Sequence, residues 1–213
     1  MSQRRREDIR AIRDRDPAAS SDLEVVLLYN GYKALRSHRC ANWFYRHGMR
    51  FIARWISQRC VRRLNIEIHP AATIGRRFFI DHGTGVVIGE TTEIGDDCTI
   101  YQGVTLGGTG KDKGKRHPTL GNNVMVGSGA KVLGPIRIGN NVRIAAGAVV
   151  LTDIPDNCTA VGIPAKVVRR NGERVEDLDQ IHIPDPVAQE LERLQGEINA
   201  LREQLAKQST TEE

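Results

Sequence analysis

Aliphatic residues recur with a period of six along residues 68–150, and mostly polar or small residues separate them. The recurring positions are Ile68, Ile74, Ile80, Ile88, Ile94, Ile100, Leu106, Leu120, Val126, Val132, Ile138, Ile144 and Val150. A fixed short period is typical of a parallel β-helix, in which each unit is one short strand plus a turn. One unit cannot bury its aliphatic residue, whereas stacked coils bury all of them in one column. The pattern therefore predicts a mainly β fold, a hexapeptide-repeat solenoid over residues 66–170.

Two interruptions break the six-residue register. The step from Ile80 to Ile88 spans eight residues, with the extra ones in 81–85. The step from Leu106 to Leu120 spans fourteen, with the extra ones in 107–118. Insertions in repeat folds map to loops on one face, often the binding face, so both interruptions are candidate parts of an active site.

Residues 1–65 have a helical pattern instead. Candidate N-caps at Ser20–Asp22 precede an apolar-periodic stretch from Leu23 to Leu35, and Gly48 is a candidate break between helices. We therefore predict an α-helical N-terminal region of residues 1–65.

The C-terminal residues carry a second helical pattern, beyond an expected linker of residues 171–185. Apolar residues follow a 4-3-4-3-4 spacing at Val187, Leu191, Leu194, Ile198, Leu201 and Leu205. This a/d spacing predicts a C-terminal coiled-coil helix over residues 186–213. A single helix packed on the solenoid is the alternative.

The net charge is +5, and the positive excess is concentrated before residue 67. Such a bias can indicate nucleic-acid binding, but no recognition motif or aromatic platform accompanies it, so we expect no nucleic acid. A solvated helical surface explains the charge, and attraction of an anionic substrate is a second explanation.

The four cysteines form no C-x-x-C pair or zinc framework. No apolar stretch follows the Arg-rich N-terminus as in a signal peptide, and no run is long enough to span a bilayer. We therefore expect reduced cysteines, a cytoplasmic location and no membrane contact.

Glu67 and His82 are candidate catalytic residues. They are fifteen residues apart, close to one coil of roughly 18 residues, so we expect them near the same corner on successive coils. A carboxylate beside an imidazole orients and strengthens a general base. A structural histidine at a turn is the alternative.

Arg116 and His117 close the long inserted loop. A guanidinium offers a planar fork for a carboxylate, so we predict substrate binding here, with a solvated charged loop as the alternative. The Gly-rich segment 107–110 lacks the Lys-Ser/Thr and helix of a P-loop, which argues against a nucleoside triphosphate site.

Around these residues the chain resembles the serine O-acetyltransferases, a family of hexapeptide-repeat acyltransferases. The matching segments are Glu67–Gly75, Ile80–Thr91, Gln102–Gly110, Lys115–Pro118 and Val161–Lys166. The resemblance covers about residues 14–170 and implies a left-handed parallel β-helix. Many family members carry Asp where this chain has Glu67.

The resemblance also implies a role for each matching position. His82 would be the general base and Glu67 its partner, while Arg116 and His117 would hold the carboxylate of L-serine. The amino group would bind Asp81 and Asp16. The acetyl-CoA groove would be lined by Gly107, Gly108, Thr109, Ser128 and Ala146.

The implied activity is acetyl transfer from acetyl-CoA to L-serine, without a metal and with L-cysteine as inhibitor. A stacked solenoid with an open lateral face, followed by an a/d seam, predicts a homotrimer. The helical region is short beside that of hexameric family members, which argues against a dimer of trimers. The chain ends in Glu213 rather than the Ile that docks into cysteine synthase, so we expect no tight complex with that enzyme.

Three other hypotheses remain open at this point. One is another hexapeptide-repeat acyltransferase. Another is a metal-dependent hydratase on the same fold, with His69, His82 and His117 as zinc ligands. The last is a non-catalytic trimeric scaffold, which leaves both register breaks unexplained.

Overall fold

The computed structural model describes residues 3–110, 113–174, 193–196 and 198. Residues 1–175 form one compact unit, and residues 176–213 form a second. In the second unit residues 193–196 and 198 are helical, with Leu194 and Ile198 exposed. The remaining positions of the predicted coiled-coil seam lie outside the described residues, so the coiled coil stays a prediction.

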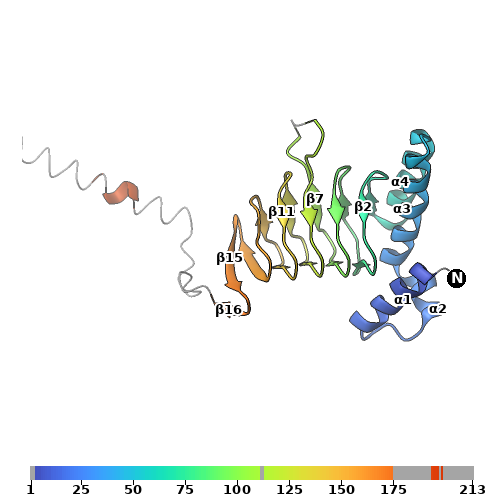
Figure 1. Ribbon diagram of the computed structural model, residues 1–213, viewed down its shortest axis with the longest axis horizontal. Helices are drawn as coiled ribbons and strands as arrows, with labels where there is room; N and C mark the ends of the chain where they lie inside the picture. The colour runs from blue at the N-terminus through green and yellow to red at the C-terminus, as the bar shows by residue number, and fades with distance from the viewer. Residues whose placement is uncertain (1–2, 111–112, 175–192, 197, 199–213) are drawn as a thin grey trace, which may run out of the picture. The chain divides into compact units, whose positions relative to one another are not determined.

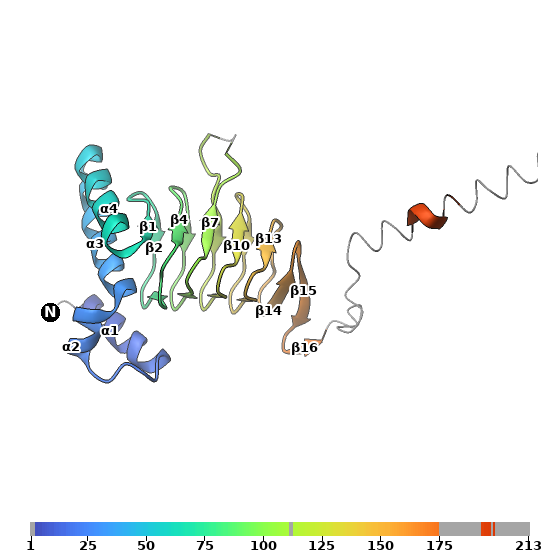
Figure 2. The ribbon, with the colours of Figure 1, turned by 180° about the vertical axis from the view of Figure 1, so that it is seen from behind.

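Short strands build three sheets that form the faces of a prism (Figures 1 and 2), and their strands pair in parallel up to β14. Sheet A contains β1 (Ile66–Ile68), β4 (Val86–Ile88), β7 (Thr105–Gly107), β10 (Lys131–Leu133) and β13 (Val149–Val150). Sheet B contains β2 (Thr73–Ile74), β5 (Glu93–Ile94), β8 (Thr119–Leu120) and β11 (Arg137–Ile138). Sheet C contains β3 (Phe79–Ile80), β6 (Thr99–Ile100), β9 (Met125–Val126), β12 (Arg143–Ile144), β14 (Cys158–Gly162), β15 (Ala165–Arg170) and β16 (Glu173–Arg174). The predicted parallel β-helix is therefore confirmed.

The strand register gives the length of each coil. Along sheet A the paired residues are Ile66 with Val86, Ile88 with Leu106, Leu106 with Val132, and Val132 with Val150. The steps are therefore 20, 18, 26 and 18 residues. Uninterrupted coils have the expected 18 residues, and each of the two longer coils contains one of the inserted segments. The recurring aliphatic residues fill the core and are 8% exposed or less.

The prism ends in a hairpin rather than in another coil. Strand β15 pairs antiparallel with β14, and β16 pairs antiparallel with β15. The Ile163–Pro164 peptide, which is cis, lies in the turn between β14 and β15. Parallel stacking therefore stops at β14.

The predicted helical N-terminal region is confirmed, and its described residues form α1 (Gln3–Arg15), α2 (Asp22–Leu28), α3 (Asn30–Arg46) and α4 (Arg50–Leu64). Ser21 is the N-cap of α2, and its side chain accepts a hydrogen bond from the Glu24 N–H. Gly48, with φ of 80°, separates α3 from α4. Helices α3 and α4 lie across the first coil (Figure 1), and Leu35 of α3 joins the core of the solenoid. No described helix is long and apolar enough to cross a bilayer.

Polar contacts hold α1 against the prism. Arg4 donates to the carbonyl of Ile74 at 2.9 Å, and Arg15 donates to the carbonyl of Arg77 at 2.9 Å. The fully buried carboxylate of Asp8 accepts from both terminal nitrogens of Arg39 on α3. Loss of one partner from such a pair leaves a buried charge unpaired. The end of α1, and the loop that follows it, are therefore fixed relative to the first coils.

The buried imidazole of His38 on α3 generates a prediction about stability. His38 is 5% exposed, and burial, followed by the nearby charge of Arg39, lowers its pKa to about 4. The folded state therefore favours the neutral imidazole, and stability present above the unfolded pKa of about 6.5 falls as pH drops towards 4. We expect this group to lower the unfolding free energy by about 2 kcal/mol between about pH 7 and about pH 5.

Urea unfolding of the wild type and a His38→Gln variant, at one protein concentration and several pH values, measures this contribution. The variant lacks the titrating group, so its stability should depend less steeply on pH. Equal pH slopes for the two proteins would contradict the assignment to His38.

Candidate active site

The first inserted segment forms the corner between sheets C and A. His82 occupies the left-handed region with φ of 56°, and the following Gly83 also has positive φ. A Cβ on Gly83 would lie 2.5 Å from Cδ1 of Ile66, and a φ of 87° at this position favours glycine. The side chain of His82 is 74% exposed, and its Nε2 lies 3.9 Å from Oδ1 of Asp81. The insertion therefore projects an accessible imidazole out of the prism.

A pocket of about 350 Å³ brings Asp81 and His82 together with Asp16 from the helical region. Its lining also includes Tyr29 and Gly31. Asp16 accepts hydrogen bonds from the N–H of Ala18 at 2.8 Å and from the hydroxyl of Tyr29 at 2.6 Å. Three site residues predicted from distant segments thus line one pocket. Tyr29, which the sequence suggested only as part of an apolar helix face, lines it as well.

The second inserted segment ends at the corner between sheets A and B. Arg116 donates to Glu90 at 2.6 Å, and Lys115 donates to the carbonyl of Thr91 at 2.7 Å. His117 is 7% exposed and lies against Gly89, where an added Cβ would be 1.9 Å from Cδ2 of the ring. Glu90 and Thr91 were not predicted as site residues, although they belong to a segment that matches the family.

The hydrogen bonds around His117 define its tautomer. The Oγ1 of Thr91 accepts from the backbone N–H groups of Arg116 and His117, both at 3.1 Å, so its own hydrogen is free to point to Nδ1 of His117 at 2.9 Å. The Thr91 N–H also donates to this Nδ1 at 3.2 Å. Nδ1 is therefore an acceptor, and the ring proton lies on Nε2. Burial, followed by the charge of Arg116, lowers the pKa of His117, so the ring is a neutral donor.

The predicted acetyl-CoA residues divide between the same two corners. Gly107 ends β7, and a Cβ on Gly108 would lie 3.0 Å from the carbonyl oxygen of Arg116. Ser128 belongs to the other corner, where the Gly147 N–H donates to its carbonyl at 2.8 Å. Thr109 follows Gly108, and Ala146 precedes Gly147.

The two parts of the candidate site lie at opposite ends of β4. His82 precedes this strand. Glu90 follows it and forms an ion pair with Arg116, so Arg116 lies at the other end of the strand. One chain therefore does not bring Arg116 or His117 to the pocket of Asp16, Asp81 and His82. The hydratase alternative has the same difficulty within one chain, because two of its proposed zinc ligands, His82 and His117, lie at opposite ends of β4.

The length of the first coil determines which residue lies beside Glu67 on the next coil. The first coil has 20 residues, because two are inserted at its corner, so Glu67 pairs with Val87 in sheet A rather than with the turn of His82. The Gly85 N–H does donate to the Asn65 carbonyl at 2.8 Å, which ties this turn to the start of β1. Within the described residues no hydrogen bond or ion pair joins Glu67 to His82, so their pairing stays a prediction.

The described residues contain no group of three His, Cys, Asp or Glu side chains that could hold a metal ion.

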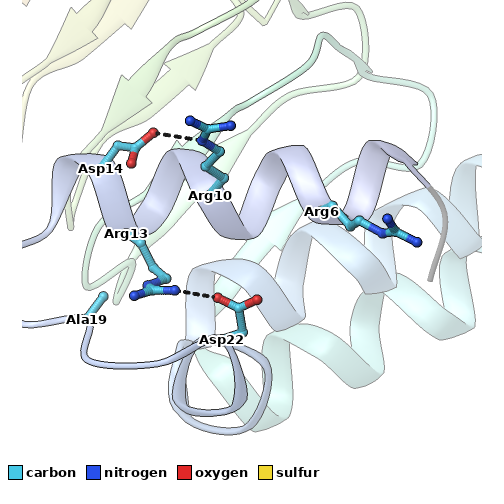
Figure 3. A pocket seen from close by; sticks show the side chains of 6 residues that line it. All are labelled: Arg6, Arg10, Arg13, Asp14, Ala19 and Asp22. Atoms are coloured by element: carbon cyan, nitrogen blue, oxygen red, sulfur yellow. Dashed lines mark hydrogen bonds and ion pairs between the residues drawn. The ribbon is translucent and has the colours of Figure 1, made fainter.

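A larger pocket of about 510 Å³ lies on the helical region beside α1 (Figure 3). None of the predicted site residues lines it. Its lining residues are Arg6, Arg10, Arg13, Asp14, Ala19 and Asp22. Arg13 pairs with Asp22 at 2.9 Å, and Arg10 pairs with Asp14 at 3.8 Å. Much of the positive charge in this pocket is therefore compensated by neighbouring carboxylates.

Comparison with known proteins identifies the class to which this fold and site belong. Residues 1–37 match the family model "Serine acetyltransferase, N-terminal", and residues 117–152 match "Bacterial transferase hexapeptide (six repeats)". The chain is thus a hexapeptide-repeat transferase with an N-terminal helical region. It is 54% identical over 209 residues to a serine acetyltransferase of Bacillus pumilus, covering 98% of this chain and 96% of that protein. The chain belongs to the serine acetyltransferase family.

Solved structures agree with this assignment. A serine acetyltransferase of Brucella abortus in complex with coenzyme A has a TM-score of 0.77 at 44% identity, covering 78% of this chain and 66% of that one. The Neisseria gonorrhoeae enzyme in complex with serine has a TM-score of 0.76 at 41% identity, covering 78% and 68%. A serine acetyltransferase in complex with cysteine has a TM-score of 0.77 at 41% identity, covering 78% and 69%. The solenoid is therefore the left-handed parallel β-helix that the resemblance implies.

The hydroxyl of Thr91 generates a prediction for the second corner. In a Thr91→Val variant two backbone N–H groups lose their acceptor and Nδ1 of His117 loses one donor. We expect the unfolding free energy to fall by about 1–3 kcal/mol, the cost of leaving buried polar groups unsatisfied. The pKa of His117 should rise, because the lost donor favoured the neutral ring.

Urea unfolding and NMR titration of the imidazole measure both effects. Thr119→Val is the matched control, since no hydrogen bond of the Thr119 side chain is found in the described part of the chain. An unchanged His117 titration in Thr91→Val would contradict the proposed hydrogen-bond arrangement.

Proposed function

We propose that this protein transfers acetyl from acetyl-CoA to the hydroxyl of L-serine, giving O-acetylserine and CoA. The observation that carries the proposal is the pocket of Asp16, Asp81 and His82 in a chain of the serine acetyltransferase family. Two carboxylates beside an exposed imidazole suit an acceptor that carries both an ammonium group and a hydroxyl. Relatives bind coenzyme A, serine and cysteine in solved structures. We propose L-cysteine as an inhibitor because it presents the same amino and carboxylate groups as serine.

In the proposed reaction His82 is the general base. Its neutral imidazole removes the proton of the serine hydroxyl while the hydroxyl oxygen attacks the thioester carbonyl. The resulting tetrahedral oxyanion accepts hydrogen bonds from backbone N–H groups of the glycine-rich segment 107–109. The C–S bond then breaks, and the imidazolium of His82 returns the proton to the CoA thiolate. Glu67 is proposed to orient the ring.

A covalent acyl-cysteine is not part of this proposal. Cys98 and Cys158 are buried in the core of the solenoid. Burial raises the pKa of Cys98 to about 11, so its thiol stays protonated and is a poor nucleophile. Free thiols are typical of a reducing compartment, which supports the cytoplasm as the proposed location.

The serine carboxylate is proposed to bind Arg116 and His117. One terminal nitrogen of Arg116 donates to Glu90, and the guanidinium group has further N–H donors for a ligand. His117 offers its Nε2–H, because Nδ1 already accepts hydrogen bonds from Thr91. These donors complement the acceptors of the Asp16, Asp81 and His82 pocket.

The opposite positions of the two corners support a homotrimer with shared sites. Donors for the carboxylate and acceptors for the ammonium lie at opposite ends of β4, yet a serine molecule spans only a few bonds. In a closed three-fold ring each prism presents one corner to each neighbour. The corner between sheets C and A of one chain then meets the corner between sheets A and B of the next. Residues from two chains complete each proposed site.

Replacement of His82 tests the chemistry. We expect His82→Ala to lower kcat by about 10²–10⁴, the usual contribution of general acid–base catalysis. CoA release, followed with a thiol reagent in the presence of L-serine, measures the rate. His47→Ala is the control, because this histidine is exposed at the end of α3. Near-full activity of His82→Ala would eliminate His82 as the base.

Complementation tests the shared site. We expect His82→Ala, which is impaired in kcat, and Arg116→Ala, which is impaired in serine binding, to regain activity at low serine concentration after their subunits are mixed and exchanged. Some interfaces then combine an intact His82 from one chain with an intact Arg116 from its neighbour. Light scattering should give a mass near three chains. Mixed oligomers without activity, with subunit exchange verified by native mass spectrometry, would contradict the arrangement.

A further inference from the structure

Tyr29 lies where the chain turns from α2 into α3. It is both the C-cap of α2 and the N-cap of α3, with an extended backbone at φ −74° and ψ 108°. Its half-buried ring lines the pocket that contains Asp16, Asp81 and His82. The helix break therefore delivers a phenol to the proposed acceptor site.

The hydroxyl of Tyr29 makes one defined contact, a 2.6 Å hydrogen bond to Oδ2 of Asp16. Burial, followed by this bond to Asp16, raises the pKa of Tyr29 above its ordinary value, so the phenol stays protonated and is the donor. The Ala18 N–H donates to Oδ1 at 2.8 Å. Each carboxylate oxygen thus has one donor and keeps further lone-pair capacity. These two bonds fix the orientation of the Asp16 carboxylate.

The backbone that carries Tyr29 is itself fixed to the solenoid. Gly31 is buried, and a Cβ at this position would lie 2.1 Å from the carbonyl oxygen of Ile80. Tyr32 is 3% exposed and packs in a cluster with Ile12 of α1 and Phe79 of β3. The start of α3 therefore lies directly on the strand that leads into Asp81, so the position of the hydroxyl is set relative to both carboxylates.

We propose that Tyr29 is a positioning residue for the ammonium group of the amino-acid acceptor. It holds Asp16 so that the unused lone pairs of the carboxylate face the pocket beside Asp81. This inference rests on the proposed function, because it assigns the ammonium of serine to these carboxylates. A phenol that acts through Asp16 affects only ligands that carry an ammonium group, namely L-serine as substrate and L-cysteine as inhibitor. Binding of acetyl-CoA is independent of it.

The Tyr29→Phe variant removes only the hydroxyl oxygen. We expect the KM for L-serine and the inhibition constant of L-cysteine each to rise about tenfold, the effect of weakening one hydrogen bond to a charged group. The kcat and the KM for acetyl-CoA should stay near wild type. Tyr32→Phe is the matched control, because no hydrogen bond of the Tyr32 hydroxyl is found among the described residues. A change of similar size in Tyr32→Phe would overturn the proposal.

A double-mutant cycle with Asp16→Asn separates positioning from a general structural effect. If Tyr29 acts through Asp16, Tyr29→Phe should raise the KM for serine in the wild type but change it little in the Asp16→Asn background. Equal effects in both backgrounds would overturn the proposal, as would a lower melting temperature with an unchanged KM. Acetylation of 3-hydroxypropionate, which lacks the ammonium, should be equally slow in the wild type and Tyr29→Phe. A wild type that does not acetylate serine would instead overturn the proposed function and this inference together.

Discussion

Each coil of the solenoid must turn one aliphatic side chain per strand into the prism, and the rest of the structure depends on this constraint. Burying one such side chain contributes about 1.5–3 kcal/mol, and a slip of one residue in a strand would turn its buried positions outward. Extra residues therefore cannot be absorbed within the strands. They leave the prism at its corners, as residues 81–85, 108–110 and 113–118 do. The same packing rule that fixes the core thus decides where the polar chemistry can be placed.

Corners of a triangular prism face different directions, which limits what one chain can assemble. Sheet A separates the turn of His82 from the end of the long loop at Arg116. A ligand as small as an amino acid cannot bridge that face. Each corner is nevertheless well ordered by its own contacts: glycines admit the turn at 83–85, and Thr91 holds His117 over Gly89. The solenoid therefore presents the two parts of the candidate site at separate corners, and the proposed association between chains would bring them together.

The sequence predicted those features that depend on local periodicity. The period of six predicted the coils, because burial of the aliphatic column repeats in every coil. Its interruptions predicted the two corners at which the candidate site lies. Spacing alone did not determine the relation of Glu67 to His82, because a count of fifteen residues ignores the inserted residues that lengthen this coil to 20. Tyr29 was missed for another reason. Its partner Asp16 is thirteen residues away, and their contact depends on how three helices pack.

The helical region has two roles that follow from one packing arrangement. An open solenoid end would leave the core beside Ile66 in water, so terminal coils of such folds need a cover. Helices α3 and α4 supply it, with Leu35 inserted among the core residues. Because Arg15 binds α1 to Asp97 and the Arg77 carbonyl, the residue that follows, Asp16, is held beside the first coil. Asp8 of α1 also accepts hydrogen bonds from Arg39 of α3. The helices that cover the solenoid end are therefore joined to the helix that positions Asp16.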